Sequence, residues 1–564
     1  MKKKIKKGFN VTLAMTLAAT MLAGCGGSKS TAPTAQEAEY SSDPSAEYAP
    51  SPSSDPSLKV ASSGEKSAQK STKNAQSDMS AGNYEEAATE GEEYMYYPPE
   101  NSETYEKPDE NGATLVSVNP LSTFAMDVDT ASYSNVRRMI EDGYSREDIP
   151  TSAVRPEEFI NYFSYDLNSP DKGEAFGITT ELADCPWNKD HKIMFVGLKT
   201  SDMNSEELPA SNLVFLIDVS GSMNSNDKLP LLKKSLNELV DNYTGEGTIS
   251  IVTYSGEETV LLEGEDLSNK KKIKKAINSL RAAGCTNGES GMKKAYELAA
   301  ENYIDGGVNR VIMATDGDLN VGISDPDELE NFIKTKKDTG VFLSVLGFGT
   351  GNFKDASMQR LADCGNGNYS YIDSMMEAKK VLVDEMTSTM VTVAKDAKIQ
   401  VEFNPNKVNS YRLIGYENRQ MDAADFNDDQ KDGGEVGAGH SVIALYEITT
   451  ADSEKAVNLK YQSNEEKEYG NEYATVNVRY KEPEADESKL SSYTVTDEDE
   501  KEKKSDNMKF AQIVAEFSLI LSDSDYKKDA SYKHITSTYP EIESKDEYKD
   551  EFIQLVRMVE KRDL

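Results

Sequence analysis

The central part of the chain, residues 206–395, alternates short apolar runs with stretches in which apolar positions recur every three or four residues. Continuous apolar runs of about 4–8 residues are typical of strands buried on both faces, and the wider spacing indicates amphipathic helices. Strands are expected at 213–217, 248–254, 259–263, 310–314, 341–347 and 369–372, with helices between them and a last helix over 375–395. Repeated strand–helix units predict an α/β fold with a doubly wound, mainly parallel sheet of Rossmann-like type.

The two flanking regions have other patterns. Residues 116–205 mix strand-like and helix-like stretches, which predicts a small α+β region. Residues 396–564 begin with apolar positions at every second residue, which favours a β-rich domain with an antiparallel sheet or sandwich. An acidic stretch without pattern over 481–506 is expected to be a linker, and amphipathic helices over 507–522 and 546–562 are expected to end the chain.

The first residues have the pattern of an export signal. A basic segment precedes a mostly apolar run over 9–21, which is too short to cross a bilayer, and Leu22-Ala-Gly-Cys25 follows. Small residues before a lone cysteine resemble the bacterial lipobox, which implies a lipoprotein signal peptide over 1–24 and a lipidated (palmitate-bearing) Cys25. An ordinary cleaved signal peptide is the alternative. Residues 25–115, rich in Ser, Ala, Pro and Glu, are expected to form a disordered stalk.

Composition and charge narrow the class of partner. Only 37% of the 564 residues are hydrophobic, which agrees with a long unfolded segment. The chain has 62 basic and 99 acidic residues and a net charge of −37, so nucleic acid is not expected as a partner. The remaining cysteines, Cys185, Cys285 and Cys364, have no CxxC spacing, and the chain has three histidines, which argues against a zinc site. We expect these thiols to be buried, and their disulfide state stays open.

Oxygen-bearing side chains gather where two predicted strands end. Asp218-Val-Ser220-Gly-Ser222 follows the first apolar strand, and Asp316 follows the strand at 310–314. Because parallel strands present their carboxyl ends at one edge, Asp316 is expected to face Asp218, with Thr286 offered by a third loop. Carboxylate and hydroxyl oxygens suit a hard cation, and a small octahedral one favours few carboxylates plus water. A polar turn that caps the next helix is the alternative interpretation.

This order of residues resembles the metal-ion-dependent adhesion site of the von Willebrand factor type A (VWA) domain, the fold shared with integrin I domains. The resemblance implies Mg²⁺, with Mn²⁺ or Ca²⁺ as alternatives, bound directly by Ser220, Ser222 and Thr286. It implies that Asp218 and Asp316 act directly or through water, and that a partner carboxylate completes the shell. Cys285 stands where a glycine often precedes the threonine in that family.

The flanks resemble a family of bacterial lipoproteins built around this domain. The segments that carry this likeness include 127–133, 157–163, 185–188, 426–429 and 437–448. They carry no activity that can be transferred, and we expect no enzyme.

Several smaller candidates are expected to be structural. Asp127 and Asp129 are expected to be solvated or paired with Arg137 or Arg138, with a second cation as the alternative. His440 is expected to be structural, and no Ser-His-Asp order is persuasive. A plain acidic turn is favoured over a calcium turn for a further set of residues: Asn427, Asp428, Asp429 and Asp432.

The sequence therefore predicts a binding protein rather than a catalyst. The leading hypothesis is a protein anchored by lipid in the cell membrane, facing the extracytoplasmic side, that binds an acidic group of an extracellular or envelope protein, or a glycan, through Mg²⁺. The second is an envelope scaffold whose metal site is mainly structural. A hydrolase is the third and least supported.

Overall fold

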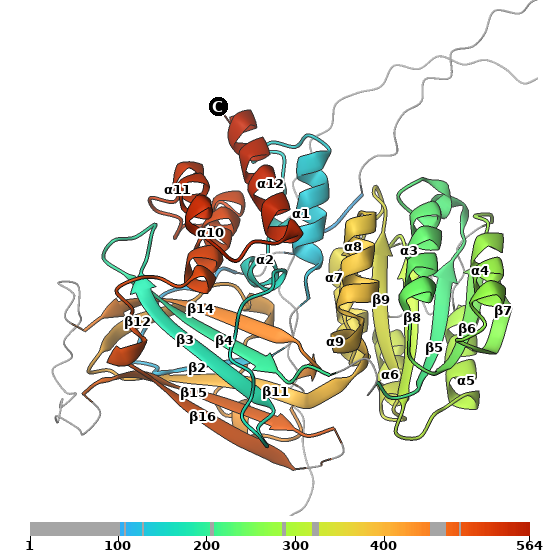
Figure 1. Cartoon of the computed structure of the whole chain (residues 1–564), viewed down its shortest axis with the longest axis horizontal. Helices are drawn as coiled ribbons and strands as arrows, with labels where there is room; N and C mark the ends of the chain where they lie inside the picture. The colour runs from blue at the N-terminus through green and yellow to red at the C-terminus, as the bar shows by residue number, and fades with distance from the viewer. Residues whose placement is uncertain are drawn as a thin grey trace, which may run out of the picture. The chain divides into compact units, whose positions relative to one another are not determined.

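The computed structural model describes residues 102–106, 109–126, 129–203, 208–284, 289–317, 326–431, 433–451, 470–483, 485 and 487–563. Its central domain contains a six-stranded sheet of order β10-β9-β8-β5-β6-β7 (Figure 1). All neighbouring pairs are parallel except β6 and β7. The strands are β5 (Ser211–Asp218), β6 (Gly247–Ser255), β7 (Glu257–Asp266), β8 (Val308–Thr315), β9 (Phe342–Phe348) and β10 (Tyr369–Ile372). The predicted doubly wound fold is confirmed.

Alternate residues of β5 supply two separate cores, which explains its uninterrupted apolar run. Leu213, Phe215 and Ile217 pack on one face of the sheet with α3 (Leu229–Asn242) and α4 (Lys270–Ser279). Val214 and Leu216 pack on the other face. The helices on that second face are α5 (Glu289–Glu301), α6 (Pro326–Lys337) and α7 (Asp355–Cys364). A strand buried on both faces has no position left for an exposed polar side chain.

The chain leaves this domain through an interrupted helix. It runs from α8 (Met375–Lys379) through a π-helical segment, Lys380–Asp384, to α9 (Met386–Met390). The prediction of one helix over 375–395 is wrong at its end, because β11 (Thr392–Phe403) already begins there.

The N-terminal and C-terminal regions, predicted as separate, build one β-sandwich together. One sheet has the order β1-β12-β14-β4-β3 and the other β13-β11-β15-β16, with β2 also paired to β11 (Figure 1). The strands from the N-terminal side are β1 (Thr114–Leu115), β2 (Leu121–Ala125), β3 (Phe176–Asp184) and β4 (Lys192–Thr200). Those from the C-terminal side are β11, β12 (Val408–Leu413), β13 (Gly434–Gly437), β14 (Ser441–Thr450), β15 (Glu472–Lys481) and β16 (Ser488–Thr496). The central domain is therefore inserted between β4 and β11.

A layer of helices covers the outer face of the first sheet. Ile193 and Phe195 of β4 pack against these helices, while Met194 and Val196 face the second sheet. The helices are α1 (Ala131–Glu141), α2 (Pro156–Asn161), α10 (Asp506–Leu521), α11 (Tyr532–Thr538) and α12 (Glu547–Asp563). The two predicted C-terminal helices are confirmed as α10 and α12. Within the described residues, no helix combines the length and the apolar composition needed to cross a bilayer.

Two boundaries differ from the sequence analysis. Residues 488–496, expected within a linker, form β16 and pair antiparallel with β15. Residues 102–106 and 109–115, expected in the stalk, contact the folded body: the Thr104 N–H donates to the Phe353 carbonyl at 3.0 Å, and β1 pairs with β12. The predicted signal peptide, Cys25 and most of the predicted stalk lie outside the described residues.

Candidate metal centre

Two buried aspartates stand at the carboxyl ends of neighbouring strands. Asp218 is the last residue of β5, and Asp316 follows directly after β8. The two strands are paired in parallel up to Ile217 and Ala314, and such strands lie about 4.8 Å apart. Both side chains are 0% exposed. The prediction that the two carboxylates share one edge of the sheet is confirmed.

The loop after Asp218 brings its two serines together. The Ser220 N–H donates to Asp218 Oδ1 at 2.8 Å, which fixes the carboxylate against the loop. The hydroxyl oxygens of Ser220 and Ser222 lie 2.9 Å apart. Ser220 is buried and Ser222 is exposed, so the pair runs from the base of the site to the solvent. The loop thus presents two neutral oxygen ligands beside one carboxylate.

The third predicted loop approaches the same place. Thr286 and Cys285 lie outside the described residues. The residues just before them do contact the serine loop: the Ala283 N–H donates to the Val219 carbonyl at 2.7 Å, and the Gly221 N–H donates to the Gly284 carbonyl at 3.1 Å.

A buried tyrosine supports the base of the site. The Tyr254 carbonyl accepts a hydrogen bond from the Val219 N–H at 3.1 Å. Burial, together with the nearby charge of Asp218, raises the pKa of Tyr254 well above its ordinary value. The phenol is therefore neutral at physiological pH and adds no charge below the two aspartates.

A lysine that the sequence analysis did not select reaches into this rim. Lys228 Nζ lies 2.9 Å from Asp316 Oδ2 and donates to Asn352 Oδ1 at 3.1 Å. Asn352 Nδ2 in turn donates to Asp316 Oδ1 at 3.2 Å. Lys228 is 6% exposed and directly precedes α3. The signal available in the sequence was a lone lysine between the D-x-S-x-S loop and the next helix.

The donor set fits a small divalent cation. Neighbouring ligands of an octahedral Mg²⁺ at about 2.1 Å lie about 3.0 Å apart, close to the observed 2.9 Å between the two serine oxygens. Among the described residues, no group of three or more His, Cys, Asp or Glu side chains has metal-binding geometry. A site made of hydroxyls with few carboxylates is what a small, hard cation tolerates and zinc does not prefer.

The smaller candidates have structural partners. Asp129 pairs at 3.1 Å with Arg419, an arginine that the sequence analysis did not name, while Asp127 lies outside the described residues. His440 is half-buried, and the partial loss of solvent around its ring lowers its pKa. Cys185 and Cys364 are buried free thiols, as expected.

The acidic turn near residue 428 is held by basic side chains. Lys398 Nζ donates to the carbonyl oxygens of Asp425 and Asp428, and Arg479 pairs with Asp429 at 2.9 Å. Asp432 lies outside the described residues. These contacts agree with the plain acidic turn favoured from the sequence.

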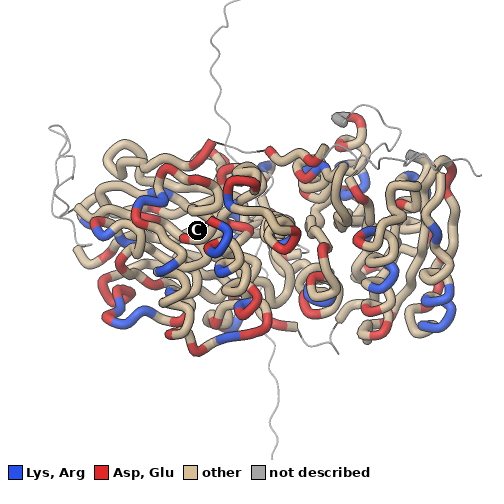
Figure 2. The backbone as a smooth tube through the Cα atoms, turned by 90° about the horizontal axis from the view of Figure 1, so that it is seen from above, with Lys and Arg blue, Asp and Glu red and all other residues tan. Residues whose placement is uncertain are grey.

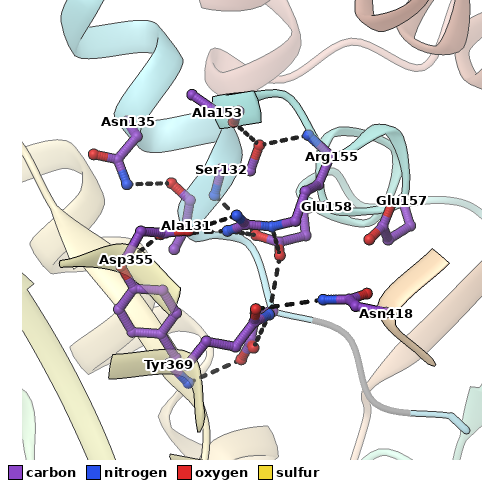
Figure 3. A network of polar contacts seen from close by, with 12 residues as sticks. Ala131, Ser132, Asn135, Ala153, Arg155, Glu157, Glu158, Asp355, Tyr369 and Asn418 are labelled. Carbon is purple, nitrogen blue, oxygen red and sulfur yellow. Dashed lines mark hydrogen bonds and ion pairs between the residues drawn. The ribbon is translucent and has the colours of Figure 1, made fainter. Parts of the chain in front are cut away.

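A second set of buried charges joins the central domain to its neighbours, and we call it the ionic seam. It comprises Asp129, Arg137, Arg155, Glu158, Asp355, Asp373 and Glu377. Arg155 contacts Glu158 and lies 2.5 Å from Asp355 of α7, whose other oxygen accepts from the Tyr369 hydroxyl at 2.9 Å (Figure 3). Arg137 of α1 pairs with Asp373 at 2.5 Å and Glu377 at 2.7 Å. The seam fixes α7 and α8 against α1 and α2.

Comparisons with known proteins agree with this architecture. Models of three families match: the von Willebrand factor type A domain over 212–385, the C-terminal domain of YfbK over 388–561, and a model described as von Willebrand factor over 99–195. YfbK of Escherichia coli (strain K12) is 41% identical over 469 residues, which cover 81% of each chain.

Solved structures also match this chain, at lower identity. A von Willebrand factor type A protein from Catenulispora acidiphila is 13% identical, covers 70% of this chain and 91% of its own, and has a TM-score of 0.38. Proximal thread matrix protein 1 from the mussel byssus, in a structure with zinc in its adhesion-site motif, is 24% identical, covers 33% of this chain and 46% of its own, and has a TM-score of 0.27. The likeness to YfbK over most of both chains decides the family: this chain belongs to the YfbK family of proteins with a VWA domain.

Proposed function

We propose that this protein is a cell-envelope lipoprotein that binds a carboxylate of a protein or glycan partner through Mg²⁺ at the rim formed by Asp218, Ser220, Ser222, Thr286 and Asp316. The observation that carries the proposal is the pair of serine hydroxyls, 2.9 Å apart, beside two fully buried aspartates. Bound Mg²⁺ would supply an electrophilic centre for the outside carboxylate. The partner is expected to be an extracellular or envelope protein, and we propose no catalytic activity.

Each residue of the rim has a distinct task in this proposal. The serine hydroxyls are neutral ligands, so they hold a cation without cancelling its charge. Asp218 orients the serine loop through the Ser220 N–H, and Asp316 adds negative charge from the neighbouring strand. Ser222 lies at the exposed end, where an outside carboxylate would approach. Mn²⁺ and Ca²⁺ are alternative occupants.

The proposed location depends on the N-terminal residues. The basic segment, the apolar run over 9–21 and the lipobox-like Leu22-Ala-Gly-Cys25 support lipid anchoring at Cys25 on the extracytoplasmic side of the cell membrane. The charge of −37 is unfavourable for nucleic acid. Asp and Glu lie throughout the described backbone, interspersed with Lys and Arg, as Figure 2 shows.

A second candidate function is an envelope scaffold in which the metal is mainly structural. The ionic seam supports it, because its buried ion pairs link α7 and the residues around α8 in the VWA domain to α1 and the start of α2. In that case the cation would stabilise the domain and leave partner binding unaffected.

One experiment separates these two functions. Full-length protein is immobilised and exposed to envelope extract with Mg²⁺ or with EDTA, and the melting temperature is measured under both conditions. The adhesion proposal expects capture to be lost in EDTA and in Asp218→Ala, and kept in Asp338→Ala, an exposed aspartate of the same domain. Capture that persists in EDTA while the melting temperature falls would favour the scaffold.

A further inference from the structure

Lys228 places a fixed positive charge against one of the two aspartates of the metal rim. Its ammonium lies 2.9 Å from Asp316 Oδ2, and both side chains are buried, at 6% and 0% exposure. A buried ion pair of this kind is screened little by salt. The pair therefore belongs to the buried base of the site and is not a surface contact.

The surrounding chain holds this lysine in one place. Gly349 has φ +72°, and a Cβ at that position would lie 2.2 Å from Lys228 Cγ and 2.3 Å from Lys228 Cε. The Gly349 carbonyl is held by the Tyr371 hydroxyl at 2.9 Å, and the ammonium is also bound by Asn352 at 3.1 Å. The glycine leaves room for the aliphatic stem, so the loop and the lysine fit each other closely.

The net charge of the contacting groups at the rim then decides whether the site, with a divalent cation bound, would attract an anionic or a neutral ligand. Asp218 and Asp316 contribute two negative charges and Lys228 contributes one positive charge. A divalent cation added to that set leaves one net positive charge, whereas without Lys228 the set would be neutral. The hydroxyls of Ser220 and Ser222 are uncharged and add nothing to this count.

We propose that Lys228 is the residue that makes this site select an anionic ligand. Its positive charge lowers the affinity of the protein for the metal ion. The same charge raises the affinity of the metal-loaded site for an outside carboxylate. The inference rests on the proposed metal-dependent binding and adds the residue that sets its preference for anions. In this proposal Lys228 acts through its contact with Asp316, and it touches neither the metal ion nor the outside carboxylate.

The two effects have opposite signs, and this makes the inference testable. Lys228→Met removes the charge and keeps the aliphatic stem. Lys228→Gln also removes the charge but retains a group that can donate a hydrogen bond to Asp316. Lys234→Met, at an exposed position of α3, the helix that begins directly after Lys228, is the matched control. Circular dichroism and the melting temperature of the metal-free proteins establish that each variant is folded.

Metal affinity is measured by titration calorimetry of the full chain with Mn²⁺. The anion is acetate, and its binding is followed through the relaxation of its methyl protons by protein-bound Mn²⁺. Both charge-removing variants are expected to bind Mn²⁺ about tenfold more tightly and acetate several-fold more weakly, while Lys234→Met matches the wild type.

Three results would overturn the inference. One is unchanged or weaker Mn²⁺ binding in Lys228→Met, because the lysine would then only support Asp316. Another is wild-type behaviour of Lys228→Gln, because a hydrogen bond and not a charge would then be responsible. The third is unchanged acetate binding in both variants. A wild-type chain that binds no Mn²⁺ contradicts the proposed function itself and is recognised before any variant is compared.

Discussion

The metal rim and the ionic seam both bury charged side chains, yet they balance those charges differently. In the seam, Arg155 contacts both Glu158 and Asp355, and Arg137 contacts Asp373 and Glu377, so each arginine is enclosed by carboxylates. At the rim, a single lysine pairs with Asp316, while the Ser220–Ser222 loop adds only neutral oxygens. Buried charges that are paired within the protein, as in the seam, connect helices to one another. Uncharged oxygen ligands, as at the rim, leave room for a cation from solution.

The strongest way to break this comparison is to remove an arginine from the seam. Arg155→Met would leave Glu158 and Asp355 buried without their cation, and this should lower the free energy of unfolding by about 3–5 kcal/mol. Urea unfolding of the full chain measures the change. Arg360→Met on the same helix as Asp355 is the control, because Arg360 is 59% exposed and 3.7 Å from Glu330, and such pairs contribute about 0–1 kcal/mol. Equal effects of the two variants would mean that the seam is not a stabilising contact.

A smaller effect on stability is expected from Glu157, a carboxyl group beside the seam that pairs with none of the seam's arginines. Glu157 precedes Glu158 in α2 and is buried, and no dashed line joins it to the network in Figure 3. Its Oε2 has no hydrogen-bond partner among the described residues. Burial, with the charges of Glu417 and Glu158, raises the pKa of Glu157 from 4.5 to about 8. The folded protein therefore retains a proton there at neutral pH.

The sign of the pH dependence follows from that raised pKa. The stability contributed by protonated Glu157 is complete below its unfolded value near 4.5 and is lost as the pH rises towards about 8. Between pH 6 and 8 the wild type should lose about 2 kcal/mol relative to Glu157→Gln, which keeps the shape without the titration. Unfolding free energies across this range measure the difference. Glu147→Gln, with its side chain 85% exposed, should follow the wild type, and parallel profiles for Glu157→Gln and the wild type would contradict the assignment.

The same two regions mark what the sequence could predict. Asp218, Ser220, Ser222 and Asp316 were found because they follow strands whose apolar runs are local and distinct. Lys228 was not found. Nothing in the residues around it indicates that its aliphatic side chain packs against Gly349, which lies more than a hundred residues later in the sequence. The seam was missed for a related reason: Arg155 meets Asp355 only because the central domain is inserted between β4 and β11.

The sandwich was predicted in part, and its errors have one cause. Alternating apolar residues identified β14 and β15, but the pairing of β4 with β14 joins residues far apart in the sequence. β16 was assigned to a linker because it is an edge strand in which only Val495 is fully buried, so it lacks the alternation of its partner. Hydrophobic periodicity in a sequence reflects which side chains are buried. An edge strand buries few side chains, so its sequence lacks the alternation by which a strand is recognised.

The smallest effect is expected from a substitution in the loop that packs against Lys228. Gly349→Ala adds a methyl group at φ +72° that would overlap the stem of Lys228, so the ammonium must move away from Asp316. We expect a loss of about 1–2 kcal/mol of metal-free stability, part of it from the left-handed backbone, and tighter Mn²⁺ binding although no charge has been removed. Gly351→Ala in the same loop is the matched control, because Gly351 has φ +96° and a Cβ there would meet nothing within 4 Å. It should show the backbone cost without the change in metal affinity. In the double variant Gly349→Ala/Lys228→Met, the Mn²⁺ affinity should equal that of Lys228→Met alone, since the displaced charge is the only link between the glycine and the metal. Additive effects on Mn²⁺ binding would instead mean that the loop acts on the rim by a route that does not involve the lysine.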